Sequence, residues 1–187
     1  ASNVFTKDFF ELISSRLNQG GVYGQWVNLF HMDATTLKSL LRAFYEVFPH
    51  GMTFANLDTG DFIMYGSGSP VIFDYARIEK RISESKFKAL LNFHAIYSAR
   101  DLMWYFSLSR EEALAASMDV PANTDTNILS EVRLSAMDND PPPEENPYDF
   151  LRGEYRFNVR PHFEVDAVDR IYDLGTYYLS EWNEPAI

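Results

Sequence analysis

The sequence predicts an α/β fold in which helices pack on a sheet, and three patterns in its first 70 residues point to that class. Apolar residues recur at helical spacing over residues 5–17 and again over 33–48. The run 22–30 between these segments carries no charge and is rich in β-branched and aromatic residues, which is typical of a buried strand. Short strand patterns follow within residues 52–66. A helix, a Gly-Gly turn and a buried strand make up half of a parallel α/β unit.

The ends of these elements carry their own signals. Thr6 is placed to cap the first helix, and Gly20-Gly21 stops it. Asp33 caps the second helix, which Pro49 and Gly51 end. Strands at 52–56 and 62–66 flank the turn residues Asp58-Thr59-Gly60, so they predict an antiparallel hairpin.

From Pro70 the pattern changes to short helices, with Ser98 and Ser109 as caps. A short strand, an acidic proline-rich linker and a C-terminal helix over 165–179 are expected after them. The sequence therefore divides into a sheet domain, a helical extension with a short strand, a linker and a C-terminal helix, at residues 1–70, 71–137, 138–161 and 162–187. The expected helices span 72–85, 86–95, 99–108 and 110–118, and the expected strand spans 128–136.

The composition and net charge favour some classes of partner over others. The chain has 187 residues, 46% of them hydrophobic, and a formal net charge of −11. Such a charge repels a phosphate backbone, so no nucleic-acid partner is expected, whereas a polyamine could be attracted. The acidic surface could equally serve solubility alone. There is no cysteine, no apolar run long enough to span a bilayer and no signal-peptide pattern, which favours a cytoplasmic protein.

Several segments together resemble the spermidine/spermine synthase superfamily. These are Phe5–Leu12 with Arg16-Leu17, Gly20-Gly21-Val22 with Gln25-Trp26, and Phe48-Pro49-His50. Residues 61–67 resemble the last strand of that family's methyltransferase-like sheet, and 123–125 with 131–136 resemble its Asn-Thr-Asp segment. The likeness covers roughly residues 3–137. It implies the C-terminal half of a doubly wound, Rossmann-type sheet with an antiparallel edge hairpin.

The same resemblance implies what this chain lacks. Complete family members bind decarboxylated S-adenosylmethionine through a glycine-rich turn, and they carry a catalytic Asp after the fourth strand. Neither segment is in these residues, and no Gly-x-Gly-x-x-Gly occurs. The resemblance therefore predicts no cofactor site and no catalytic residue in this chain. It also predicts an absent N-terminal half as partner, in a parent protein that could be membrane-anchored.

Three residues are candidates for binding a polyamine substrate: Gln25, Asp58 and Asp61. Gln25 matches the place where the family sets a Gln beside the amine, although it could be a core amide. Asp58 and Asp61 are predicted near the carboxyl edge of the sheet and could hold an ammonium group, although the same residues suit a hairpin turn. The four histidines have no partners at metal-ligand spacing, so no metal is expected.

Two functions stay open at this point. In the first, the chain is a fragment of a polyamine aminopropyltransferase, inactive alone. In the second, it is a non-catalytic synthase-like scaffold for protein interaction; a third possibility, an unrelated small domain, requires the resemblance to be chance. The strand at 22–29 would lack a neighbour on one side, which predicts a homodimer through that edge or coverage by the tail. Residues 174–186 weakly resemble the start of a tetratricopeptide repeat, with a lone docking helix as the alternative.

Overall fold

The computed structural model describes residues 2–30, 32–71, 74–84, 86, 88–128 and 146–152. It divides into two compact units. The first holds the described residues up to Val71 and those from Ser107 onward. The second holds the described residues between them, from Asp74 to Phe106.

The sheet of the first unit has four strands: β1 (Val22–Asn28), β2 (His50–Asn56), β3 (Asp61–Ser67) and β4 (Phe106–Ser109). Their order is β1-β3-β2-β4. β1 and β2 both pair antiparallel with β3, so they run in the same direction. Helix α2 (Ala34–Val47) connects them. The result is a β-α-β unit with one antiparallel strand inserted between its two strands. The α/β class and an antiparallel hairpin are confirmed, but the predicted place of the hairpin at the edge of the sheet is wrong, because β2 and β3 lie between β1 and β4.

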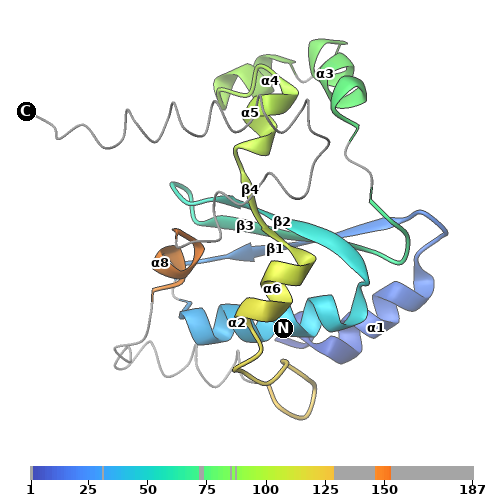
Figure 1. Ribbon diagram of the computed structural model, residues 1–187, viewed down its shortest axis with the longest axis vertical. Helices are drawn as coiled ribbons and strands as arrows, with labels where there is room; N and C mark the ends of the chain where they lie inside the picture. The colour runs from blue at the N-terminus through green and yellow to red at the C-terminus, as the bar shows by residue number, and fades with distance from the viewer. Residues whose placement is uncertain are drawn as a thin grey trace, which may run out of the picture. The chain divides into compact units, whose positions relative to one another are not determined.

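Three helices cover one face of this sheet: α1 (Lys7–Arg16), α2 and α6 (Arg110–Ala116) (Figure 1). A 3-10 turn, Ser2–Phe5, leads into α1. The predicted caps are in place, because Thr6 accepts from the Phe9 N–H and Asp33 accepts from the Thr36 N–H. Ser109 and Glu112 form a reciprocal capping box at α6. These side chains satisfy backbone donors that the helices leave without partners.

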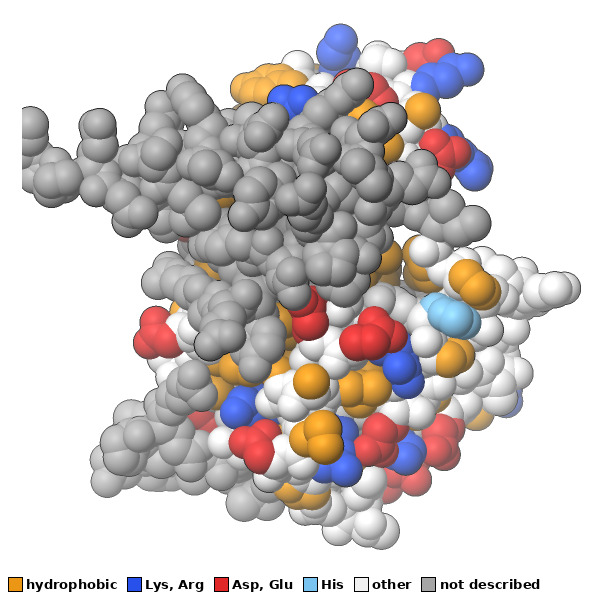
Figure 2. All heavy atoms as spheres, in the orientation of Figure 1, with side chains coloured by type: hydrophobic (Ala, Val, Ile, Leu, Met, Phe, Trp, Pro, Cys, Tyr) orange, Lys and Arg blue, Asp and Glu red, His pale blue; other side chains and the backbone are white. Residues whose placement is uncertain are grey.

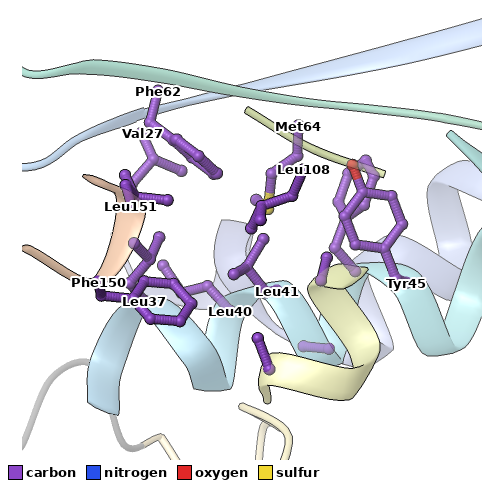
Figure 3. Close-up of a cluster of buried hydrophobic side chains, with 14 of the residues drawn as sticks. Val27, Leu37, Leu40, Leu41, Tyr45, Phe62, Met64, Leu108, Phe150 and Leu151 are labelled. Atoms are coloured by element: carbon purple, nitrogen blue, oxygen red, sulfur yellow. The ribbon is translucent and has the colours of Figure 1, made fainter. Parts of the chain in front are cut away.

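The core lies between the sheet and these helices (Figure 3). Val27, Phe62 and Met64 point into it from alternate positions of β1 and β3, and they meet Leu37 and Leu41 of α2. All five side chains are buried. The period-2 burial of β3 and the helical-period burial of α2 are what the sequence patterns predicted.

A further helix, α8 (Pro147–Arg152), lies inside the segment that the sequence analysis takes as a linker. Its Phe150 and Leu151 belong to the core cluster. Pro147 suits the first helical position, where its missing N–H is not needed. The prolines and acids around this stretch dominated the sequence pattern, and the two apolar residues were too few to show a period.

The second unit contains α3 (Tyr75–Glu84), α4 (Lys88–Phe93) and α5 (Ala99–Met103). The helix predicted over 99–108 is shorter, since α5 stops at Met103 and β4 begins at Phe106. The predicted helix over 165–179, and the predicted strand beyond residue 128, lie outside the described residues. Among the described helices, none is both long and apolar enough to cross a bilayer.

Candidate functional site

The carboxyl ends of β1 and β2 lie beside the start of β3, at the end of the sheet that is called its carboxyl edge below. In the strand register, Asn28 pairs with Asp61 and Asp61 pairs with Asn56, so the three residues form a row across the sheet. The carboxyl ends of parallel strands are where ligands bind in α/β proteins. This edge therefore contains the candidate site, and it includes two of the three residues predicted from the sequence.

Asp61 lies on the sheet face opposite the helices. Trp26 Nε1 donates a hydrogen bond to its Oδ1 at 2.8 Å, and Thr59 Oγ1 donates to its Oδ2 at 2.6 Å. Both donors are neutral groups, and each carboxylate oxygen retains a lone pair for another donor. The Trp26 side chain remains 51% exposed, so its ring is accessible beside the carboxylate.

Asp58 is exposed in the turn that joins β2 to β3. Its backbone N–H donates to Asn56 Oδ1 at 3.2 Å, which fixes the start of the turn. None of the ion pairs among the described residues involves Asp58 or Asp61. Two carboxylates without a cationic partner thus lie three positions apart at one edge. They could accept an ammonium group by charge-assisted hydrogen bonds.

Gly60 joins this turn to the end of β1 through its backbone. Its φ of +69° is a left-handed conformation that favours glycine, and its carbonyl accepts from the Leu29 N–H at 2.8 Å. A Cβ atom there would lie 2.8 Å from the Tyr148 hydroxyl and 3.1 Å from the Phe30 ring. The Tyr148 hydroxyl is itself buried and has no hydrogen-bond partner in the described part of the chain. The turn is therefore fixed against β1 and α8, which keeps its acidic side chains in place.

Gln25 lies elsewhere. It pairs across the sheet with Met64, a core residue, so it is on the helix-covered face. The Tyr23 hydroxyl donates to Gln25 Oε1 at 2.6 Å, and Gln25 Nε2 donates to the Trp26 carbonyl at 2.9 Å. The structure thus brings Asp58 and Asp61 to one edge and leaves Gln25 on the other face, with its amide engaged in local hydrogen bonds.

The Tyr23 ring, whose hydroxyl donates to Gln25, is itself held in place by aromatic packing. Its ring stacks on Phe44 and Phe48 of the α2 region, with ring centroids 6.2 and 6.0 Å apart. Burial raises the pKa of the Tyr23 hydroxyl above its ordinary value, so this group is a neutral donor at physiological pH. The Tyr23–Gln25 pair is therefore a fixed part of β1 in this structure.

Trp26 is not among the site residues predicted from the sequence, because an indole in a strand pattern is more often a core group. The alternation within β1 could have indicated otherwise, since Val27 and Leu29 face the core and Trp26 must then face away. Thr59 carried no such signal, because only the folded turn brings it to Asp61. Within the described residues, no three His, Asp or Glu side chains gather as a metal-ion site would require.

Comparisons with protein-family models, with curated proteins and with solved structures find no match to this chain. The choice of function therefore depends on the residues at this edge and on the topology that brings them together.

Proposed function

We propose that this chain forms the amine-binding wall of a spermidine-synthase-like aminopropyltransferase. One observation carries the proposal: Asp61 accepts a hydrogen bond from the exposed Trp26 ring at the carboxyl ends of two parallel strands, and neither Asp61 nor Asp58 in the adjoining turn has a cationic partner in the described structure. Carboxylates and an indole are the groups that bind organic ammonium ions, by charge-assisted hydrogen bonds and by cation–π attraction of about 0.5–1 kcal/mol at an exposed site.

The topology supports the same proposal. Two strands that run in one direction, joined by a helix and separated by one antiparallel strand, fit the C-terminal half of a doubly wound sheet with an antiparallel strand. In the described residues β1 has a strand neighbour on one side only, β3. The open side of β1 is where the absent N-terminal half would continue the sheet.

The described turns at the carboxyl ends of β1 and β2 do not fit decarboxylated S-adenosylmethionine. The turn after β1 begins Leu29-Phe30, and the turn after β2 is Leu57–Gly60, so neither gives the run of glycines that brings backbone N–H groups close to a nucleotide. The proposal therefore assigns amine binding alone to this chain. It assigns the cofactor and the catalytic base to the absent half, and it expects no transferase activity from the chain by itself.

Isothermal titration calorimetry with spermidine and with 5′-methylthioadenosine tests this assignment. We expect saturable spermidine binding that Asp61→Asn weakens about tenfold, the loss typical of one charge-assisted hydrogen bond, and no nucleoside binding. Asp125→Asn is the matched control, because it removes the same charge from another exposed turn. Equal weakening by both variants would show diffuse charge attraction and would contradict a site at Asp61.

One observation favours the second function, a non-catalytic scaffold. Both oxygens of Asp61 and both polar groups of the Gln25 amide already have partners inside the protein. If these groups serve only the turn and the strand, the edge is structural. An absence of spermidine binding in the calorimetric titration would favour this scaffold over the transferase.

A further inference from the structure

Residues 74–106, the described part of the second unit, differ in charge from the rest of this acidic chain. Residues 74–106 hold six Lys and Arg against four Asp and Glu, whereas the whole chain holds 16 against 27. Three of these cations, Arg77, Lys80 and Arg81, occupy exposed positions of α3 at spacings of three and four residues. Such spacing places them on one side of the helix, opposite the buried Ile82. Glu84 is exposed on the same side, so the exposed side of α3 carries three cations and one acid and is net positive.

Three of the four acids in residues 74–106 accept hydrogen bonds from backbone N–H groups of the same unit. Asp74 accepts from the Arg77 N–H at 2.9 Å at the start of α3. Glu79 accepts from the Ala99 N–H at 2.6 Å, and Asp101 accepts from the Tyr97 and Ser98 N–H groups at 2.8 Å, at the start of α5. At these positions the positive ends of the helix dipoles offset the carboxylate charges.

The cations, in contrast, stay open to solvent. Among the described residues, Arg77, Lys80, Arg81 and Lys88 form no ion pair. Their field is not cancelled by a neighbouring carboxylate contact, and it acts over about 8 Å at physiological ionic strength. Residues 74–106 therefore carry a net positive charge in a chain whose net charge is −11.

Exposed apolar side chains lie next to these cations in the same unit. Leu90 and Phe93 of α4 are 56% and 83% exposed, and Tyr97 just after it is 63% exposed. No residue of α4 is buried. Helix α4 contacts α3, and Figure 2 shows basic, acidic and hydrophobic side chains on the visible surface of this part of the molecule. A water-exposed phenyl ring on a helix with no buried side is unfavourable unless something covers it.

We propose that α3 and α4 dock on the surface of an anionic phospholipid bilayer. Leu90 and Phe93 would enter the boundary between headgroups and acyl chains, Tyr97 would lie at headgroup level, and Arg77, Lys80, Arg81 and Lys88 would contact lipid phosphates. A single-stranded nucleic acid is the less fitting partner, because it needs stacked rings along a groove and Leu90 offers no stacking surface. The proposal is independent of amine binding in the first unit.

Vesicle co-sedimentation of the full chain tests the docking surface. We expect binding to phosphatidylcholine vesicles that contain phosphatidylserine, little binding to phosphatidylcholine alone, and weaker binding as KCl is raised. Phe93→Ser and the double variant Lys80→Gln/Arg81→Gln should each lower the partition coefficient about tenfold. All three positions are exposed, so far-ultraviolet circular dichroism and thermal unfolding should match the parent chain.

The controls sit in the first unit. Met118→Ser removes a side chain that is 76% exposed, and Arg16→Gln removes an exposed cation, so both should leave vesicle binding unchanged. The proposal is overturned if the chain binds neither vesicle, if the control variants weaken binding as much as Phe93→Ser, or if a single-stranded RNA oligonucleotide binds more tightly than the vesicles and loses binding in the same variants.

Discussion

At the residue scale, the carboxylate of Asp61 has a fold role and a candidate binding role at once. It accepts from Trp26 Nε1 and from Thr59 Oγ1, which ties the start of β3 to β1 and to the hairpin turn. Both contacts orient the carboxylate, and neither donor is a cation. A charged group held in one orientation by its neighbours loses little conformational entropy on binding an ammonium ion.

Gly66 sets the approach of β3 to α2. A Cβ atom at this position would lie 2.5 Å from Phe48 Cγ and 2.7 Å from Phe44 Cε1, inside a packed aromatic group. Gly66→Ala should therefore lower the free energy of unfolding by about 1–3 kcal/mol through overpacking. Urea unfolding followed by circular dichroism measures this loss.

Gly68 gives the matched control, because a Cβ atom there would meet nothing within 4 Å. Gly68→Ala should change the free energy of unfolding by less than about 0.5 kcal/mol. If the two variants are equally stable, the close packing of Phe44 and Phe48 on β3 is incorrect.

At the element scale, helix α2 depends on its first turn. Asp33 is 4% exposed, and its Oδ1 accepts from the Thr36 N–H at 2.6 Å. Asp33→Ala leaves that buried donor without a partner, so it should cost about 0.5–2 kcal/mol of stability. Asp33→Asn keeps a cap oxygen and should recover most of the loss in the same urea titration. A loss as large for Asn as for Ala would mean that the cap is not the cause.

The helices and strands of residues 5–67 could be predicted because each carries a local signal. Thr6, Asp33 and the Asp58–Gly60 turn mark ends, and the apolar periods mark the buried sides. β4 could not be predicted in the same way. Its Thr53 partner lies far away in the sequence, and Thr53 Oγ1 accepts from the Leu108 N–H at 2.8 Å in the buried sheet. Such a strand is chosen by tertiary contacts that outweigh local propensity.

At the scale of the whole molecule, two of the three predicted site residues lie together and the third does not. The sequence places Asp58 and Asp61 in a turn at the carboxyl edge of the sheet, and the structure agrees. The separation of Gln25 from them follows from strand register, because a one-residue difference in β1 decides which face a side chain occupies. A homodimer through the open edge of β1 stays a prediction, as does completion of the sheet by an N-terminal half.

The distribution of charge is also a property of the whole chain. A net charge of −11 describes the average surface, yet residues 74–106 are basic and the edge at Asp58 and Asp61 is acidic. These two charges underlie the two proposals, a polyamine at the first unit and an anionic lipid surface at the second. The net charge alone suggests attraction of a polyamine, but it does not indicate the positive balance of residues 74–106.

The central claim is that an ammonium compound binds beside Trp26 and Asp61. The most direct test is to follow the indole N–H resonances of the three tryptophans by ¹⁵N-edited nuclear magnetic resonance during a spermidine titration, with Trp26→Phe to assign the Trp26 signal. We predict a saturable shift of the Trp26 resonance, because its N–H donates to Asp61 Oδ1, and no comparable shift of the Trp104 resonance. A Trp26 resonance that stays unmoved at saturating spermidine would contradict the account.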